Sequence, residues 1–195
     1  MGQSWKKRGA LPNNDRPSAR SAPPMEEKAG AHILDQRDII ASLDREFARL
    51  HFRSTAIIEN TPAALLYEVP ALPVTSGLQS IGESVLRSAA VIEQTFGGLT
   101  ANLWDDPFEW TLPEQLSTPA TVVAHLLEVE GTRQHAFTSF TEDSCLLKSI
   151  ASPADGLVPL IDLLLRTVLR ASHYQAVALV TLKALSGISP EGFII

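Results

Sequence analysis

The sequence lacks the short patterns that mark most enzyme families. It has no glycine-rich phosphate loop, no Cys-x-x-Cys pair, no His-Glu-x-x-His zinc motif and no neighbouring serine, histidine and aspartate. Its one cysteine, Cys145, excludes an internal disulfide and fits a reducing compartment, so we expect a cytoplasmic protein. We interpret Cys145 as a small buried residue and not as a nucleophile.

Strand signals and long apolar runs are also missing. The 195 residues contain no alternating run of β-branched residues and no Asn-Gly hairpin turn. The most apolar stretch, 157–185, is interrupted by charged side chains such as Asp162, Arg166 and Arg170. A membrane span needs about 20 largely apolar residues, so we expect a buried helix there and no membrane as partner.

The first 31 residues differ in composition from the rest. They are rich in Pro, Ser, Asn, Gly and charge and show no apolar period, so we expect 1–31 to be a disordered tail and 32–195 to be the folded domain. Residues 1–30 hold six Lys/Arg and three Asp/Glu, whereas the remainder holds ten and nineteen. A folded part that acidic argues against nucleic acid as a partner.

Four stretches have the apolar spacing of amphipathic helices. They cover about 33–60, a region that begins at Ser80, 118–140, and 157–185. The residues expected to face the core are Leu43, Phe47, Leu50, Ser54 and Ile57 in the first, Ile81, Val85, Ala89, Ile92, Phe96 and Leu99 in the second, and Val122, Leu126, Val129 and Ala136, widened by Val123 and Leu127, in the third. These patterns predict an all-α fold, a four-helix bundle.

Helix ends and connections carry further predictions. Ser80 and Glu83 fit a capping box, and Thr118 fits an N-cap followed by Pro119 at the first helical position. Glycine inside a helix costs roughly 1 kcal/mol, so Gly97-Gly98 indicates a close helix contact or a kink. We expect residues 141–156 to be a loop or a short turn.

Two groups of side chains near the third helix are interpreted from the same pattern. The aromatic residues of the acidic connection before it, among them Trp104 and Phe108, are expected to plug the open end of the bundle, with a ligand-gripping loop as the alternative. Glu128, Glu130 and Arg133 are expected to lie mostly off the apolar face.

The order of elements over about residues 38–187 resembles the DinB-like family of damage-inducible four-helix bundles, which includes YfiT-type metal-dependent hydrolases and thiol S-transferases. The resemblance is carried by Ser80-Ile-Gly-Glu-Ser-Val-Leu-Arg87 and by His173-Tyr-Gln-Ala-Val-Ala-Leu-Val-Thr-Leu-Lys-Ala-Leu-Ser-Gly187. It implies the fold and a cleft between the helices.

The resemblance also implies where the family's three metal-binding histidines would fall. The places are Arg87 on the second helix and Leu169 and His173 on the fourth. Leucine has no lone pair and arginine stays protonated, so His173 is the one candidate ligand for a divalent metal such as zinc or nickel. The other interpretation of His173 is a bundle histidine that is satisfied by a carboxylate or a carbonyl.

Two functions therefore stay open. The first is a non-enzymatic DinB-like bundle without a cofactor, which forms a homodimer and has a stress-related or scaffolding role. The alternative is a metal-dependent thiol S-transferase or hydrolase with a rearranged site. In that site His173 is joined by His125 or by one of three carboxylates, Glu93, Glu128 or Glu130.

Overall fold

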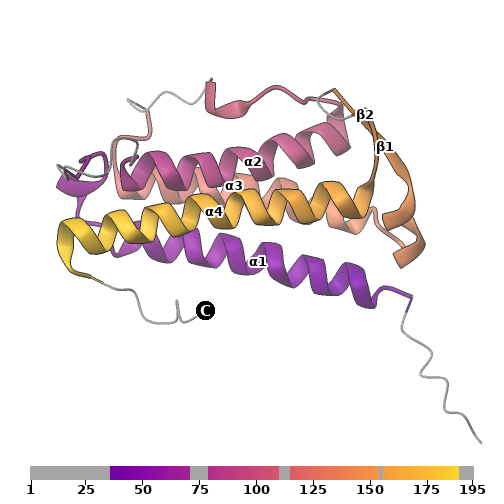
Figure 1. Ribbon diagram of the computed structural model, residues 1–195, viewed down its shortest axis with the longest axis horizontal. Coiled ribbons are helices and arrows are strands. Elements are labelled where there is room, and N and C mark those ends of the chain that lie inside the picture. Colours follow the sequence, from indigo (N-terminus) through magenta and orange to yellow (C-terminus); the bar gives the residue numbers. More distant parts are fainter. Residues whose placement is uncertain (1–35, 71–78, 110–114, 154–155, 189–195) are drawn as a thin grey trace, which may run out of the picture. The chain divides into compact units, whose positions relative to one another are not determined.

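The computed structural model describes residues 36–70, 79–109, 115–153 and 156–188, which are mostly helical (Figure 1). The tail predicted at 1–31 lies outside the described residues. The elements are α1 (Asp38–Glu59), the 3-10 turn η1 (Ala63–Leu65), α2 (Ile81–Ala101), η2 (Pro107–Glu109), α3 (Pro119–Thr138), η3 (Asp143–Leu147), β1 (Ser149–Ser152), β2 (Gly156–Pro159) and α4 (Leu160–Ser186). None of the described helices combines the length and the hydropathy needed to cross a membrane.

The apolar stripes of α1 and α2 lie in the core, as predicted. All five expected residues of α1 are buried, and so are the expected residues of α2 apart from Leu99, which is partly buried and packs against the core. Phe47 of α1, Phe96 of α2 and Phe137 of α3 form an aromatic cluster with ring centroids 5.1 to 5.7 Å apart. This cluster ties three helices together with edge-on and tilted contacts.

The helices pack in a defined order. α1 and α2 each pack against both α3 and α4, and α1 and α2 make a lesser contact with each other. Thr95 on α2 bonds Thr167 on α4, and nearer the start of α2 Ser88 donates to the carbonyl oxygen of Ala171. These two helices therefore run antiparallel. Figure 1 shows that α1 and α4 run in one direction and α2 and α3 in the other.

The connection from α2 to α3 runs back along α2, because the two helices are parallel. Near its start, Trp104 packs on Gly98, where an added Cβ would lie 2.4 Å from the indole ring. Near its end, the carbonyl oxygen of Leu116 accepts a hydrogen bond of 2.6 Å from the hydroxyl of Tyr67. Tyr67 in turn lies against Gly82, at the beginning of α2.

That path changes the interpretation of the aromatic residues. Phe108 lies against Arg87, which is well inside α2. The described aromatic residues therefore lie along the side of α2 and do not plug an end. The Gly97-Gly98 pair marks a close contact, but not the predicted contact between helices, because the partner at Gly98 is the ring of Trp104 in the connection that follows α2.

Within residues 141–156 the predicted short turn is present as η3, but the strands that follow it were not predicted, so the expectation of a fold without strands was wrong. After η3, β1 and β2 form an antiparallel hairpin in which Ile150 lies opposite Val158. Strands of four residues are too short to produce a recognisable alternation of apolar and polar side chains, which explains why the sequence did not reveal them. Cys145 is buried in η3, as expected.

Asp143, in the η3 turn of this region, caps the start of α1. Arg37, the residue before α1, makes no side-chain cap. Instead, the carboxylate of Asp143 accepts hydrogen bonds of 3.0 and 2.9 Å from the backbone N–H groups of Ile39 and Ile40. A carboxylate at this position satisfies free N–H groups and stabilises the positive end of the helix dipole.

Candidate functional site

Arg87, on α2, stands where the family resemblance implies a metal-binding histidine, and its guanidinium is held on two sides. Nε and Nη2 of Arg87 donate to Oε1 of Glu83 at 3.2 and 3.1 Å. The guanidinium carbon lies 3.9 Å from the centroid of the Phe108 ring, in the range of a cation–π contact. Oγ of Ser80 accepts a hydrogen bond from the backbone N–H of Glu83, which is one half of the predicted capping box. The described bonds of the Glu83 carboxylate go to Arg87 and do not complete the box.

The two family places on α4 face the solvent. Leu169 is 70% exposed. His173 is exposed, and its ring contacts that of Tyr174 with centroids 5.7 Å apart. Both lie on the opposite side of α4 from Ala171, which is buried against α2. No described interaction joins either of them to Arg87, so the structure does not bring the three places together.

The structure does bring together two residues of the alternative site. Nε2 of His125, on α3, lies 3.9 Å from Oε2 of Glu93, on α2. That oxygen is buried and has no hydrogen-bond partner among the described residues. Burial raises the pKa of the Glu93 carboxyl; the charge of His125 lowers this pKa, and that of Glu128 raises it.

His125 and Glu93 face a cavity of about 370 Å³. It lies between α2, α3 and the connection that follows α2. Its lining residues are Glu93, Gln94, Gly97, Leu103, Asp105, Pro107 and His125. Two carboxylates and one imidazole are groups that hold cations or exchange protons. Among the described residues, however, no group of three or more His, Cys, Asp or Glu side chains is placed to hold a metal ion.

The other members of the alternative site, Glu128, Glu130 and His173, are not among the residues that line this cavity. The described contacts join His173 to neither His125 nor Glu93. Glu130 is engaged elsewhere, with Arg133. Of the residues that the sequence proposed for a rearranged site, only His125 and Glu93 are therefore in direct proximity, with Glu128 close enough to affect the pKa of Glu93.

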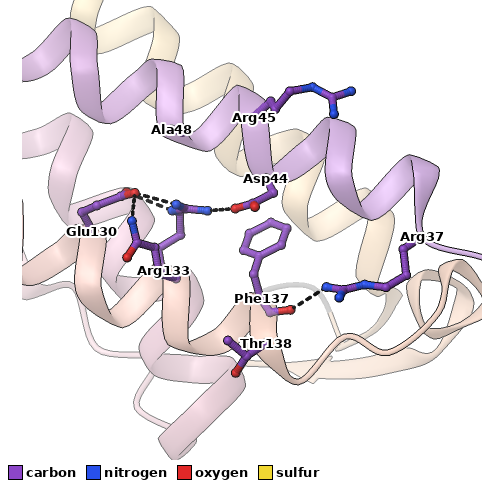
Figure 2. Close-up of a pocket in the computed structure, with 9 residues that line it drawn as sticks. Arg37, Asp44, Arg45, Ala48, Glu130, Arg133, Phe137 and Thr138 are labelled. Carbon is purple, nitrogen blue, oxygen red and sulfur yellow. Dashed lines mark hydrogen bonds and ion pairs between the residues drawn. The ribbon is translucent and has the colours of Figure 1, made fainter.

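A second cluster, around Arg133, was missed. The sequence pattern predicted Arg133 off the apolar face, and this was wrong, because the residue is only 2% exposed. Figure 2 shows its guanidinium between Glu130 of the same helix and Asp44 of α1. Nε and Nη2 bond the two oxygens of Glu130 at 2.9 and 2.5 Å. Position 133 is one heptad after Leu126, and this spacing was the signal for burial.

The Arg133 cluster joins α1 to α3 and satisfies its own charges. Burial alone would lower the pKa of Arg133, but hydrogen bonds and charge from Glu130 and Asp44 outweigh it, so the pKa is raised. Phe137 lines the adjoining cavity of about 490 Å³, and its carbonyl oxygen accepts a 3.3 Å bond from Arg37 (Figure 2). Because both carboxylates are already paired, we interpret this cluster as structural.

No family model, no curated protein and no solved structure matches this chain. The chemistry of both clusters is therefore argued from their geometry.

Proposed function

We propose that the chain is a cytoplasmic four-helix bundle of the DinB-like type that is not an enzyme and has a stress-related or scaffolding role. The observation that carries this proposal is the state of the three family metal places. Arg87 is paired with Glu83 and stacked on Phe108, while Leu169 and His173 face the solvent. Three ligands that converge on one open position are what a catalytic metal site requires.

The packing of the helices supports the bundle. Each of α1 and α2 packs against the same two helices, and a long connection returns along α2 so that α3 starts beside the beginning of α2. Helices joined by one long crossover and packed around a shared core are typical of four-helix bundles. The aromatic cluster described above lies in this core.

The chemistry of the three places supports the absence of a family-like metal centre. A guanidinium stays protonated and repels a divalent cation. Leu169 has no donor atom, so His173 is the only one of the three that can ligate. One exposed imidazole binds zinc or nickel too weakly to retain the ion through dialysis, because known sites use about three or four protein ligands.

The test is elemental analysis of protein purified without a histidine tag, incubated with zinc and with nickel, and then dialysed. We expect far less than one metal per chain. Near one metal per chain, lost in His173→Ala and retained in His125→Ala, would overturn the proposal, because it would mean that the family-like place is functional.

The Glu93–His125 pair favours a second candidate, a metal-dependent thiol S-transferase or hydrolase whose rearranged site contains His125 and Glu93 but not His173, which the sequence had placed there. The favouring observation is the buried Oε2 of Glu93, which lies 3.9 Å from Nε2 of His125 at a cavity and accepts no hydrogen bond from the part of the chain that the structure describes. In the same experiment this candidate predicts about one metal per chain, lost in His125→Ala and unaffected in His173→Ala. No metal in either the parent or the variants would rule it out.

A further inference from the structure

The outer side of α4 carries an apolar stripe. Leu169 is 70% exposed, and Leu165, Ala176 and Val180 are exposed as well. Successive helical residues are rotated by about 100°, which places these four side chains within a sector of about 60°. Because these side chains are exposed, no described element covers the stripe. In Figure 1, α4 lies in front of the other helices. Exposed apolar residues gathered on one face, unlike scattered ones, indicate an interaction surface.

The stripe is symmetric about the middle of α4. Leu169 and Ala176 lie at equal distances on either side of the midpoint of 172–173, and so do Leu165 and Val180. Two copies of α4 that cross antiparallel at this midpoint therefore set Leu169 of one copy against Ala176 of the other, and Leu165 against Val180. Large side chains opposite smaller ones interdigitate well, and a twofold contact must be self-complementary in this way.

Charges continue the same symmetry. Asp162 and Lys183 are both exposed, and they too lie at equal distances from the midpoint. Antiparallel copies would place Asp162 of each beside Lys183 of the other, giving two attractive pairs. A parallel arrangement would instead set like charges together, which is unfavourable. The apolar and the charged side chains of the stripe therefore both favour packing against a second copy of α4 in the antiparallel orientation.

We infer that two copies of this chain form a homodimer through α4, with a twofold axis near residues 172–173. The inference goes beyond the proposed function and stands whether or not the chain holds a metal. The segment from Asp162 to Lys183 is about 32 Å long. An interface made by one such helix from each copy lies near the small end for specific complexes, about 1,200 Å², so we expect a weak dimer.

The first test is sedimentation of the full chain over a wide range of concentrations, compared with Leu169→Glu. This variant places a carboxylate in the apolar contact and should weaken the dimer at least about tenfold. Phe52→Glu is the matched control, because Phe52 on α1 is also 70% exposed but lies off the stripe. We expect it to leave the dimer unchanged, and circular dichroism checks that both variants remain folded.

The second test is a charge exchange that distinguishes the two orientations. Asp162→Lys and Lys183→Asp should each weaken the dimer, and the double variant should restore it, because opposite charges again face each other. A chain that is monomeric at every concentration would overturn the inference, and so would a dimer that is unaffected by Leu169→Glu. A stripe covered by the chain's own terminal residues would give the first of these results.

Discussion

Replacing Arg133 with methionine tests the role assigned to the cluster between α1 and α3. Methionine keeps an unbranched apolar stem and removes the guanidinium. Glu130, whose side chain is 11% exposed, would then lose both bonds to Arg133 and keep only the bond from Gln134, at 2.8 Å. Asp44, at 48% exposed, would be largely solvated instead.

The magnitude follows from these unequal exposures. Removing one partner of a buried ion pair costs about 3–5 kcal/mol, because the other charge stays buried without compensation. Water compensates Asp44 but hardly reaches Glu130, so we expect about 3 kcal/mol. For a domain of this size, 1 kcal/mol corresponds to about 2–4 °C in the thermal midpoint. Arg133→Met should therefore lower that midpoint by about 6–12 °C.

Urea unfolding followed by circular dichroism measures this loss. Adding Glu130→Gln should recover most of it, because the uncompensated charge is removed. Arg45→Met is the control, since Arg45 is an exposed arginine at the same cavity and should change stability by less than about 0.5 kcal/mol. A double variant that is less stable than Arg133→Met would refute the reasoning.

Three further predictions concern the core and the candidate site. Leu126→Ala should cost about 2–5 kcal/mol in urea unfolding, because Leu126 is buried in the core; a loss below about 0.5 kcal/mol would contradict that placement. Gly98→Ala should lower the thermal midpoint, since its Cβ would meet the ring of Trp104, whereas Gly131→Ala, with open space around it, should gain about 1 kcal/mol. A midpoint that rises in both would rule out the tight contact. Glu93→Gln should be more stable than the parent at pH 7 and nearly equal to it below pH about 4, because a raised carboxyl pKa means that the protonated, folded form loses stability as pH rises through that pKa. Midpoints that differ equally at both pH values would show that the Glu93 charge is not the cause.

The parts of the fold that depend on local spacing could be predicted from the sequence. The inward positions of α1, such as Phe47 and Leu50, follow a 4-3-4-3 spacing that one helix alone determines. The start of α3 at Pro119 after Thr118 was also correct, and the structure adds a reciprocal bond in which the backbone N–H of Thr118 donates to Oγ1 of Thr121. Leu127 was misplaced: it is exposed, because α3 buries a narrower stripe than its composition suggested.

The parts that depend on distant residues could not be predicted in the same way. The buried guanidinium of Arg133 is paired with Asp44, on another helix, as well as with Glu130 of its own helix, and the first of these partners is brought to it by packing. The sequence offered His125 and Glu93 among several candidates. Choosing this pair required the parallel packing of α2 and α3, which depends on the path of the connection between them. Site residues on separate helices are defined by packing, and no periodicity within one helix encodes it.

The capping of α1 by Asp143 has a consequence for synthesis of the chain. The N–H groups of Ile39 and Ile40 emerge from the ribosome about a hundred residues before the carboxylate that satisfies them. Translation adds about 5–20 residues per second. The first turn of α1 is therefore exposed for several seconds before the Asp143 carboxylate that caps it has been synthesised. We therefore expect the beginning of the first helix to become ordered only after the third helix has been made, although it is among the first helical residues to leave the ribosome.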